Sequence, residues 1–321
     1  MPNPLATRQD ALTPAVFREL AELPAEAEWL ANLRNGRTRR AYRQDVLDFC
    51  RFAGVASPET MRSVTRPHVI AWRTHLAQRN LSGATIRRKL SALSSLFDHL
   101  CECNVAADNP VRGVQRPPVD ANEGKTPALS DAQARLLLDA PPADTRKGQR
   151  DRAILATLLY HGLRREELCR LRIQDIQSRE GVIHLRVRGK RGKMRFIPAS
   201  PHALRLIDVY LDAAGHGTDP AAPLFQPLHR NRDPAAGRAL DPQSVYENVV
   251  RHYGAKTGLN ELVGGLCVHA LRATAATNAL QHDADIGRVQ EWLGHASIAT
   301  TRLYDRRGTR PEESPTFRVK Y

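Results

Sequence analysis

Cysteine is scarce in this sequence, and the few cysteines form no motif. They are Cys50, Cys101, Cys103, Cys169 and Cys267. Their number is odd and no two of them form a C-x-x-C pair, which argues against a disulfide framework and against a zinc site. We therefore expect free thiols, a reducing compartment and no bound metal.

Long apolar stretches are also missing. The sequence has no run of the length that a transmembrane helix needs. Its start, Met1-Pro2-Asn3-Pro4, lacks the basic residues and the apolar segment of a signal peptide. It has no P-loop and no repeat of fixed period. We predict a cytoplasmic protein with no membrane partner and no cofactor.

Positive charge, by contrast, is abundant. The formal net charge is +14, and the parts before and after Thr126 are both basic. Only 7 of the 48 basic residues are lysine, and the guanidinium groups of arginine match phosphate oxygens well. The composition favours a partner with an extended phosphate backbone, although a GC-rich genome would also raise the arginine content.

The 321 residues are enough for two domains. Pro117-Pro118 and Gly124 lie in a stretch with few large apolar residues, which is typical of a linker. We predict an N-terminal arm over 1–23, a helical DNA-binding domain over 24–113, a linker over 114–126, a second domain over 127–306 and a tail over 307–321.

Helical periodicity in the first domain is clearest after Ser82-Gly83. The residues expected to face inward there are Ile86, Leu90, Leu93, Phe97 and Leu100. A second helix is predicted from Thr38 to about Phe52, with Tyr42, Val46, Phe49 and Phe52 inward. Basic residues crowd the start of both helices, and we predict that they contact DNA phosphates, with a solvated charged face as the alternative. These predicted DNA contacts are Arg39, Arg40, Arg43, Arg87, Arg88 and Lys89.

The second domain is predicted to be mostly helical. One helix is capped by Ser130, and a longer helix from about Gln149 to His161 ends at Gly162. Further helices are expected over 201–213, 242–253, 269–281, 285–293 and 297–306. Residues 182–188 and 194–197 flank a glycine-containing basic turn, as in a two-stranded hairpin. The predicted fold class is mainly α with a small antiparallel β-sheet (α+β).

Five short signals in the second domain carry side chains suited to phosphate chemistry. They are Gly162-Leu163-Arg164 with Glu167, the turn Lys190-Arg191-Gly192-Lys193, His269 with Arg272, Gly294-His295, and Tyr304. Tyr304 follows His295 by nine residues and is expected two turns into a helix. Taken singly, each signal has an ordinary alternative: a surface arginine, a solvated hairpin tip, a capping histidine or a buried tyrosine.

Together, in this order and at these separations, the signals resemble the catalytic set of the tyrosine recombinase (phage integrase) family, which includes Xer-type recombinases. The resemblance covers residues 127–306 and extends more loosely to the helical N-terminal part, which is similar to the family's SAM-like core-binding domain. It departs at Ala273, where many relatives carry a second histidine that is not among the catalytic groups.

The resemblance implies a role for each residue. Tyr304 would attack the scissile phosphate and form a 3′-phosphotyrosine. Arg164, Arg272 and His295 would bind the nonbridging phosphate oxygens. His269 would take the phenolic proton, Lys190 would protonate the departing 5′-oxygen, and Glu167 would orient the site. Arg191 and Lys193 would contact DNA. Phosphoryl transfer depends chiefly on positioning and charge stabilisation, so these cations make metal ions and ATP unnecessary.

The sequence thus predicts a site-specific DNA recombinase that acts on double-stranded recombination sites in a bacterial nucleoid. The resemblance also implies assembly into a tetramer on DNA, with accessory DNA-bending proteins or a partner recombinase as further candidates. In the tail, Phe317, Val319 and Tyr321 alternate with other residues, which predicts a strand that pairs with the edge of the 182–197 sheet. The resemblance implies that such a tail docks on a neighbouring subunit. Two alternatives stay open: a type IB topoisomerase-like enzyme and a catalytically inactive DNA-binding architectural protein.

Overall fold

The computed structural model describes residues 24–118, 126–189, 192–228 and 237–306. They form two compact units, divided between Asp120 and Ala121. This division falls within the segment predicted as a linker. The predicted arm and tail lie outside the described residues, as do Lys190 and Arg191 of the basic turn.

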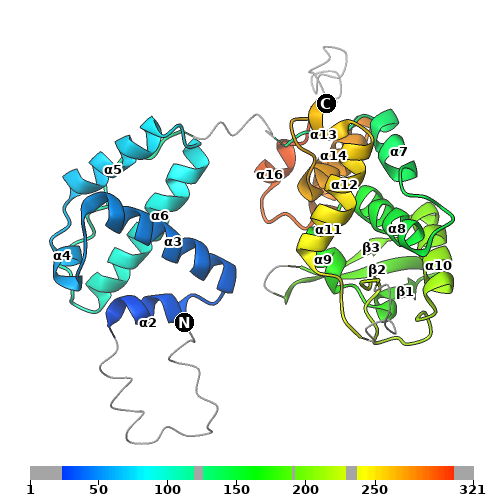
Figure 1. Cartoon of the computed structure of the whole chain (residues 1–321), viewed down its shortest axis with the longest axis horizontal. Coiled ribbons are helices and arrows are strands. Elements are labelled where there is room, and N and C mark those ends of the chain that lie inside the picture. The colour runs from blue at the N-terminus through cyan, green and yellow to red at the C-terminus, as the bar shows by residue number, and fades with distance from the viewer. Residues whose placement is uncertain (1–23, 119–125, 190–191, 229–236, 307–321) are drawn as a thin grey trace, which may run out of the picture. The chain divides into compact units, whose positions relative to one another are not determined.

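The first unit is entirely helical over its described residues. Its helices are α2 (Ala25–Asn32), α3 (Gly36–Ala53), α4 (Pro58–Arg62), α5 (Arg66–Gln78) and α6 (Gly83–Glu102) (Figure 1). The Ser82 hydroxyl accepts a hydrogen bond from the backbone N–H of Thr85 and so begins α6. All five apolar residues predicted to face inward on α6 are buried, which confirms its periodicity.

The prediction for the preceding basic helix was less accurate. α3 begins at Gly36 rather than Thr38, because the Asn35 side chain caps the backbone N–H groups of Arg37 and Thr38. Phe49 is buried against Trp72, with their rings edge to face at 5.1 Å. Phe52, however, is 38% exposed, so the prediction that it faces inward was wrong. Its ring lies on the partly exposed face of the helix and stacks on His75.

The second unit has a three-stranded antiparallel sheet and a larger number of helices. The sheet has the order β1 (Ile176–Arg179), β2 (Val182–Arg188) and β3 (Met194–Pro198). β2 and β3 confirm the predicted hairpin, in which Leu185 pairs with Ile197. β1 was not predicted, because its four residues include only one large apolar side chain. The fold class is thus mainly α with a small antiparallel β-sheet, as predicted.

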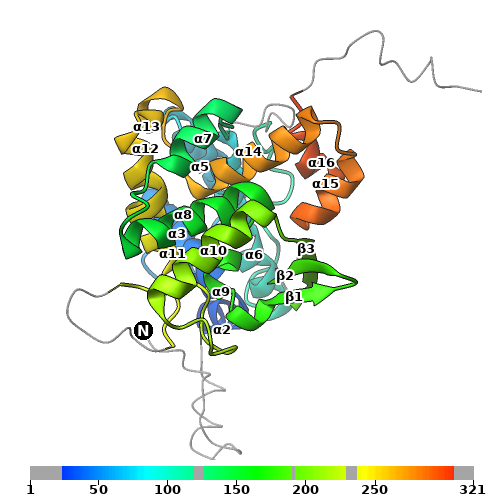
Figure 2. The ribbon, with the colours of Figure 1, turned by 90° about the vertical axis from the view of Figure 1, so that its right-hand side faces the viewer.

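The helices of this unit build the main core together with the buried face of the sheet. They are α7 (Asp131–Asp139), α8 (Arg146–His161), α9 (Arg165–Arg170), α10 (Pro201–Ala214), α11 (Pro242–Val245), a π-helical turn (Tyr246–Arg251), α12 (His252–Lys256), α13 (Leu259–Leu262), α14 (Val268–Gln281), α15 (Ile286–Leu293) and α16 (Ile298–Arg302). α8 is central, since it contacts both α10 and α14 (Figure 2). It begins at Arg146, earlier than predicted, because Thr145 caps it.

Among the described residues, no helix has the length and the apolar composition required to cross a membrane.

Candidate active site

Two helix ends meet in the second unit. α8 ends at Gly162 and α15 ends at Gly294, and both glycines have positive φ angles, of 57° and 66°. A Cβ atom at position 162 would lie 2.8 Å from the Leu293 side chain, so the close approach of the two ends depends on glycine. The sequence predicted both helix ends correctly.

Arg272 of α14 joins these two helix ends. Its Nη1 donates to the carbonyl of Gly162 and its Nη2 to the carbonyl of Leu293, each at 2.6 Å. The side chain is 1% exposed, and its Nε has no hydrogen-bond partner among the described residues. Burial, followed by the charge of Arg164, lowers the pKa of Arg272 to about 10, so it stays a cation at neutral pH.

Glu167 organises the other cations of the site. Its carboxylate accepts from the backbone N–H and the Nη1 of Arg164, both at 2.8 Å, and caps α9. Arg195 of β3 donates to both oxygens of Glu167, at 2.9 and 2.8 Å, and its Nε donates to the carbonyl of Trp292. Burial alone would raise the pKa of Glu167, but Arg195 and then Arg164 lower it to about 2. The predicted link between Glu167 and Arg164 is present.

Tyr304 lies beside the histidine of α14. Its phenolic oxygen is 3.1 Å from Nε2 of His269, and its side chain is almost fully buried. The prediction that Tyr304 lies two turns into a helix was wrong, because α16 ends at Arg302. The tyrosine follows in a turn, where its carbonyl accepts from the Thr277 hydroxyl.

The second histidine, His295, completes this side of the site. Its ring stacks on Tyr304 with a centroid distance of 5.9 Å, and its Nδ1 is 2.9 Å from the Thr301 hydroxyl. Burial, then the charges of Arg272 and Arg164, lower the pKa of His295 to about 4. The same three causes lower the pKa of His269. Both imidazoles are therefore neutral at pH 7.

The structure thus brings together Arg164, Glu167, His269, Arg272, His295 and Tyr304. Of the basic turn, Lys190 and Arg191 lie outside the described residues and Lys193 is exposed. Arg195 was missed, because in the sequence nothing distinguishes it from the other arginines of the hairpin. The one available signal was Glu167, a carboxylate that directly precedes the apolar Leu168 and needs a second cation once it is buried.

The arginines predicted to contact DNA have different environments in the first unit. Arg40 and Arg43 are exposed and form no ion pair with another described residue. Arg39 donates to the carbonyls of Ala31 and Leu33 and so holds the turn before α3. The exposed Arg87 and Arg88 bond to the Pro117 carbonyl and to the Asp45 carboxylate, respectively.

Lys89 does not lie on the outer face where it was predicted. Only 11% of its side chain is exposed, and its ammonium group lies 3.3 Å from Asp45 and 2.8 Å from Asp48. It also approaches the ring of Trp72, with 6.0 Å between Nζ and the ring centroid. These contacts neutralise Asp45, whose side chain is 3% exposed, so Lys89 is part of the domain's interior.

Comparison with known proteins identifies both units. The pattern of the phage integrase family matches residues 127–309. The pattern of the phage integrase N-terminal SAM-like domain matches residues 28–102. One match falls in each compact unit, and the segment between the two matches is unassigned.

Similar proteins include tyrosine recombinases of several bacteria. Tyrosine recombinase XerC of Pelobacter propionicus is 35% identical over 273 residues, which are 83% of this chain and 83% of that protein. Tyrosine recombinase XerD of Pseudomonas putida is 32% identical over 297 residues, which are 91% of this chain and 93% of that protein.

Solved structures show the same fold. XerH site-specific recombinase bound to a palindromic difH substrate has a TM-score of 0.68 at 20% identity, covering 92% of this chain and 81% of that one. A lambda integrase dimer bound to a COC′ core site has a TM-score of 0.66 at 16% identity, with coverages of 95% and 85%. From the matched patterns and the relatives above 30% identity, the chain belongs to the phage integrase family of tyrosine recombinases.

Proposed function

We propose that this protein is a site-specific DNA recombinase that cuts and rejoins DNA strands through a covalent bond to Tyr304. One observation carries the assignment: the phenolic oxygen of Tyr304 lies 3.1 Å from Nε2 of His269, next to the cations Arg164 and Arg272. The set combines a nucleophile, a base and positive charge for a phosphate, which is what phosphoryl transfer requires.

The first step is attack by the phenol. Burial raises the pKa of Tyr304, although the positive charges of Arg272 and Arg164 oppose that effect. The phenol is therefore protonated at pH 7 and needs a base. His269 is neutral, and its Nε2 is within hydrogen-bond reach, so it takes the proton as the phenolic oxygen bonds to phosphorus.

Charge then builds on the nonbridging phosphate oxygens. Arg164, with a side chain that is 38% exposed, and the buried Arg272 supply the positive charge. When the Thr301 hydroxyl donates to Nδ1 of His295, the single proton of that neutral imidazole lies on Nε2. From there His295 donates to a phosphate oxygen.

The bond to the 5′-oxygen breaks as the bond to Tyr304 forms. Lys190 of the basic turn donates the proton that the 5′-oxygen acquires. The products are a 3′-phosphotyrosine and a free 5′-hydroxyl, and attack by the 5′-hydroxyl of another strand reverses the step. The phosphodiester energy is kept in the phosphotyrosine, so the cycle is closed without a nucleotide cofactor.

The DNA partner is double-stranded DNA that carries a recombination site. The solved relatives named for complexes with a difH substrate and with a COC′ core site support this assignment. The exposed Arg40 and Arg43 supply phosphate contacts from the helical unit, and assembly on paired sites gives a tetramer in the bacterial nucleoid.

The test is a trapping experiment with a nicked DNA site that loses a short fragment on cleavage. The wild-type chain should form a covalent adduct that survives denaturing electrophoresis, and Tyr304→Phe should form none while binding DNA normally. Tyr321→Phe serves as the matched control and should form the adduct. An adduct in Tyr304→Phe, or its loss in Tyr321→Phe, would refute the assignment. Relaxation of any supercoiled plasmid, without sequence preference, would favour a topoisomerase instead.

A further inference from the structure

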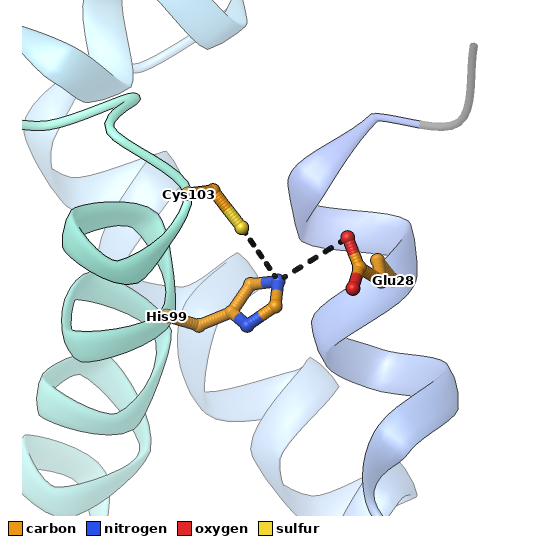
Figure 3. Close-up of side chains that lie close together, drawn as sticks. All are labelled: Glu28, His99 and Cys103. Carbon is orange, nitrogen blue, oxygen red and sulfur yellow. Dashed lines mark hydrogen bonds and ion pairs between the residues drawn. The ribbon is translucent and has the colours of Figure 1, made fainter. Parts of the chain in front are cut away.

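Three potential metal ligands converge in the helical unit, far along the chain from the residues of the active site. Glu28 lies on α2, His99 lies near the end of α6, and Cys103 is the residue that ends α6 (Figure 3). His99 and Cys103 are four residues apart, so they lie on one face of the helix, one turn from each other. Glu28 faces them from the neighbouring helix.

The distances between the ligand atoms suit a small divalent ion. His99 Nε2 lies 3.6 Å from Cys103 Sγ and 3.8 Å from Glu28 Oε2, and all three atoms lie within 4.8 Å of one another. Tetrahedral zinc with ordinary bond lengths would separate such ligands by about 3.4–3.6 Å. The His–Cys distance already fits, and the Glu28 side chain, which is 54% exposed, has only to move slightly.

A fourth side chain supports the histidine from behind. The carboxylate of Glu102 lies 4.0 Å from Nδ1 of His99, the nitrogen opposite the cluster. Glu102 is 78% exposed, so its carboxylate is free to move into hydrogen-bond range of Nδ1, where it would orient a metal-binding imidazole and raise its basicity. The only side chain of the group with low exposure is His99, at 11%, so the ring is held by the fold while Glu28 and Cys103 stay accessible to an ion from solvent.

Charge also favours a cation at this position, because the carboxylates of Glu28 and Glu102 lie 3.8 and 4.0 Å from the two ring nitrogens of His99. A metal ion binds cysteine as the thiolate and displaces its proton.

We propose that Glu28, His99 and Cys103 form a binding site for a thiophilic divalent cation of the zinc class, with the fourth coordination position open to water. The ion joins α2 to the end of α6. These two helices are otherwise connected by packing and by the hydrogen bond from Trp29 Nε1 to Ser95 Oγ, at 3.1 Å. The site is structural, and it stabilises the helical unit without taking part in strand cleavage. The absence of a C-x-x-C pair had suggested no zinc site, but ligands from two helices leave no such pair in the sequence.

The test titrates cobalt(II) into the full-length, reduced protein and records the visible and near-ultraviolet spectrum. One equivalent of cobalt should produce a thiolate-to-metal charge-transfer band, which zinc(II) should abolish by displacement. Cys103→Ser should lack the band, and Cys101→Ser, its neighbour outside the cluster, should keep it. Glu102→Gln should weaken binding about 10- to 100-fold, as is usual for a residue that supports a ligand. Glu28→Gln, which loses a ligand, should weaken it further.

A spectrum without a thiolate band would overturn the proposal, even if cobalt binds to other histidines. An unchanged band in Cys103→Ser would overturn it as well. A second measurement does not depend on spectroscopy: one equivalent of zinc should raise the melting temperature of the wild-type chain and of Cys101→Ser but not that of Cys103→Ser. Equal shifts in all three proteins would contradict the site.

Discussion

Nε2 of His269 lies 3.1 Å from the phenolic oxygen of Tyr304, although 35 residues separate them along the chain. The contact holds because α14 carries the histidine, while the Thr277 hydroxyl of the same helix fixes the backbone carbonyl of Tyr304. The proposed base and the proposed nucleophile are therefore anchored on one helix, and their separation does not depend on a long loop.

This contact predicts how cleavage depends on pH. The cleavage rate is measured at DNA concentrations below saturation. It should fall as the pH drops through a value below 6.5, because His269 cannot act as a base once it is protonated. Burial, Arg272 and Arg164 all lower the pKa of His269 from its usual value of 6.5. His269→Gln should slow cleavage by about 10²–10⁴-fold and should lose this acidic limb. His282→Gln, at the end of the same helix, is the control. An unchanged limb in His269→Gln would assign the base elsewhere.

Arg195 is predicted to be a positioning residue for the arginines of the site. Arg195→Lys keeps the charge but cannot bind both oxygens of Glu167 while also donating to the Trp292 carbonyl. Single-turnover cleavage should slow about 10- to 100-fold with little change in DNA affinity. Arg186 lies in the neighbouring strand β2 and pairs with Asp175, and Arg186→Lys should not slow cleavage.

A double variant separates positioning from general stability. If Arg195 acts through Glu167, Arg195→Lys combined with Glu167→Gln should be no slower than the worse single variant. Additive losses would show that Arg195 acts independently of Glu167. A lowered melting temperature with an unchanged cleavage rate would show that Arg195 has only a structural role.

The two lysines of the basic turn should differ in function. Lys190→Ala should slow cleavage strongly, and a substrate with sulfur at the 5′-bridging position should restore the rate, because a thiolate leaves without an acid. Lys193 is exposed, so Lys193→Ala should mainly weaken binding and reduce its salt dependence. Equal rescue of both variants, or of neither, would be inconsistent with Lys190 as the acid.

Lys89 should contribute to stability and the exposed arginines of α3 to DNA binding. Lys89→Met leaves the buried Asp45 with one fewer cation, and should lower the free energy of unfolding of the helical unit by about 2 kcal/mol or more. Arg40→Ala and Arg43→Ala should weaken DNA binding and each reduce the slope of affinity against salt by about 1. Urea denaturation and binding titrations at several salt concentrations distinguish the two effects. If Lys89→Met left stability unchanged but reduced the slope of DNA affinity against salt, Lys89 would contact DNA as first predicted.

Features with a local cause were predictable from the sequence. Apolar spacing predicted the buried face of α6, and glycine at position 162 predicted the end of α8. The order of the chemical motifs predicted which residues would meet, as in the pair of His269 and Tyr304.

Features that depend on partners distant in the sequence were not predictable. Lys89 is basic and near a helix start, so its burial follows only from Asp45 and Asp48 on another helix. Arg195 is likewise one of several arginines in a hairpin until Glu167 is placed opposite it. The early end of α16 has the same kind of cause, since the Tyr304 carbonyl bonds to Thr277 of α14.

The hydrogen bonds of Arg272 have a consequence for how this protein can evolve. The same guanidinium that is proposed to supply charge to the phosphate also binds the carbonyls of Gly162 and Leu293, at the ends of α8 and α15. Selection for a folded domain and selection for activity therefore act on one side chain. A descendant that abandons recombination but still binds DNA is expected to change Tyr304 or the more exposed Arg164 first and to retain the arginine at position 272.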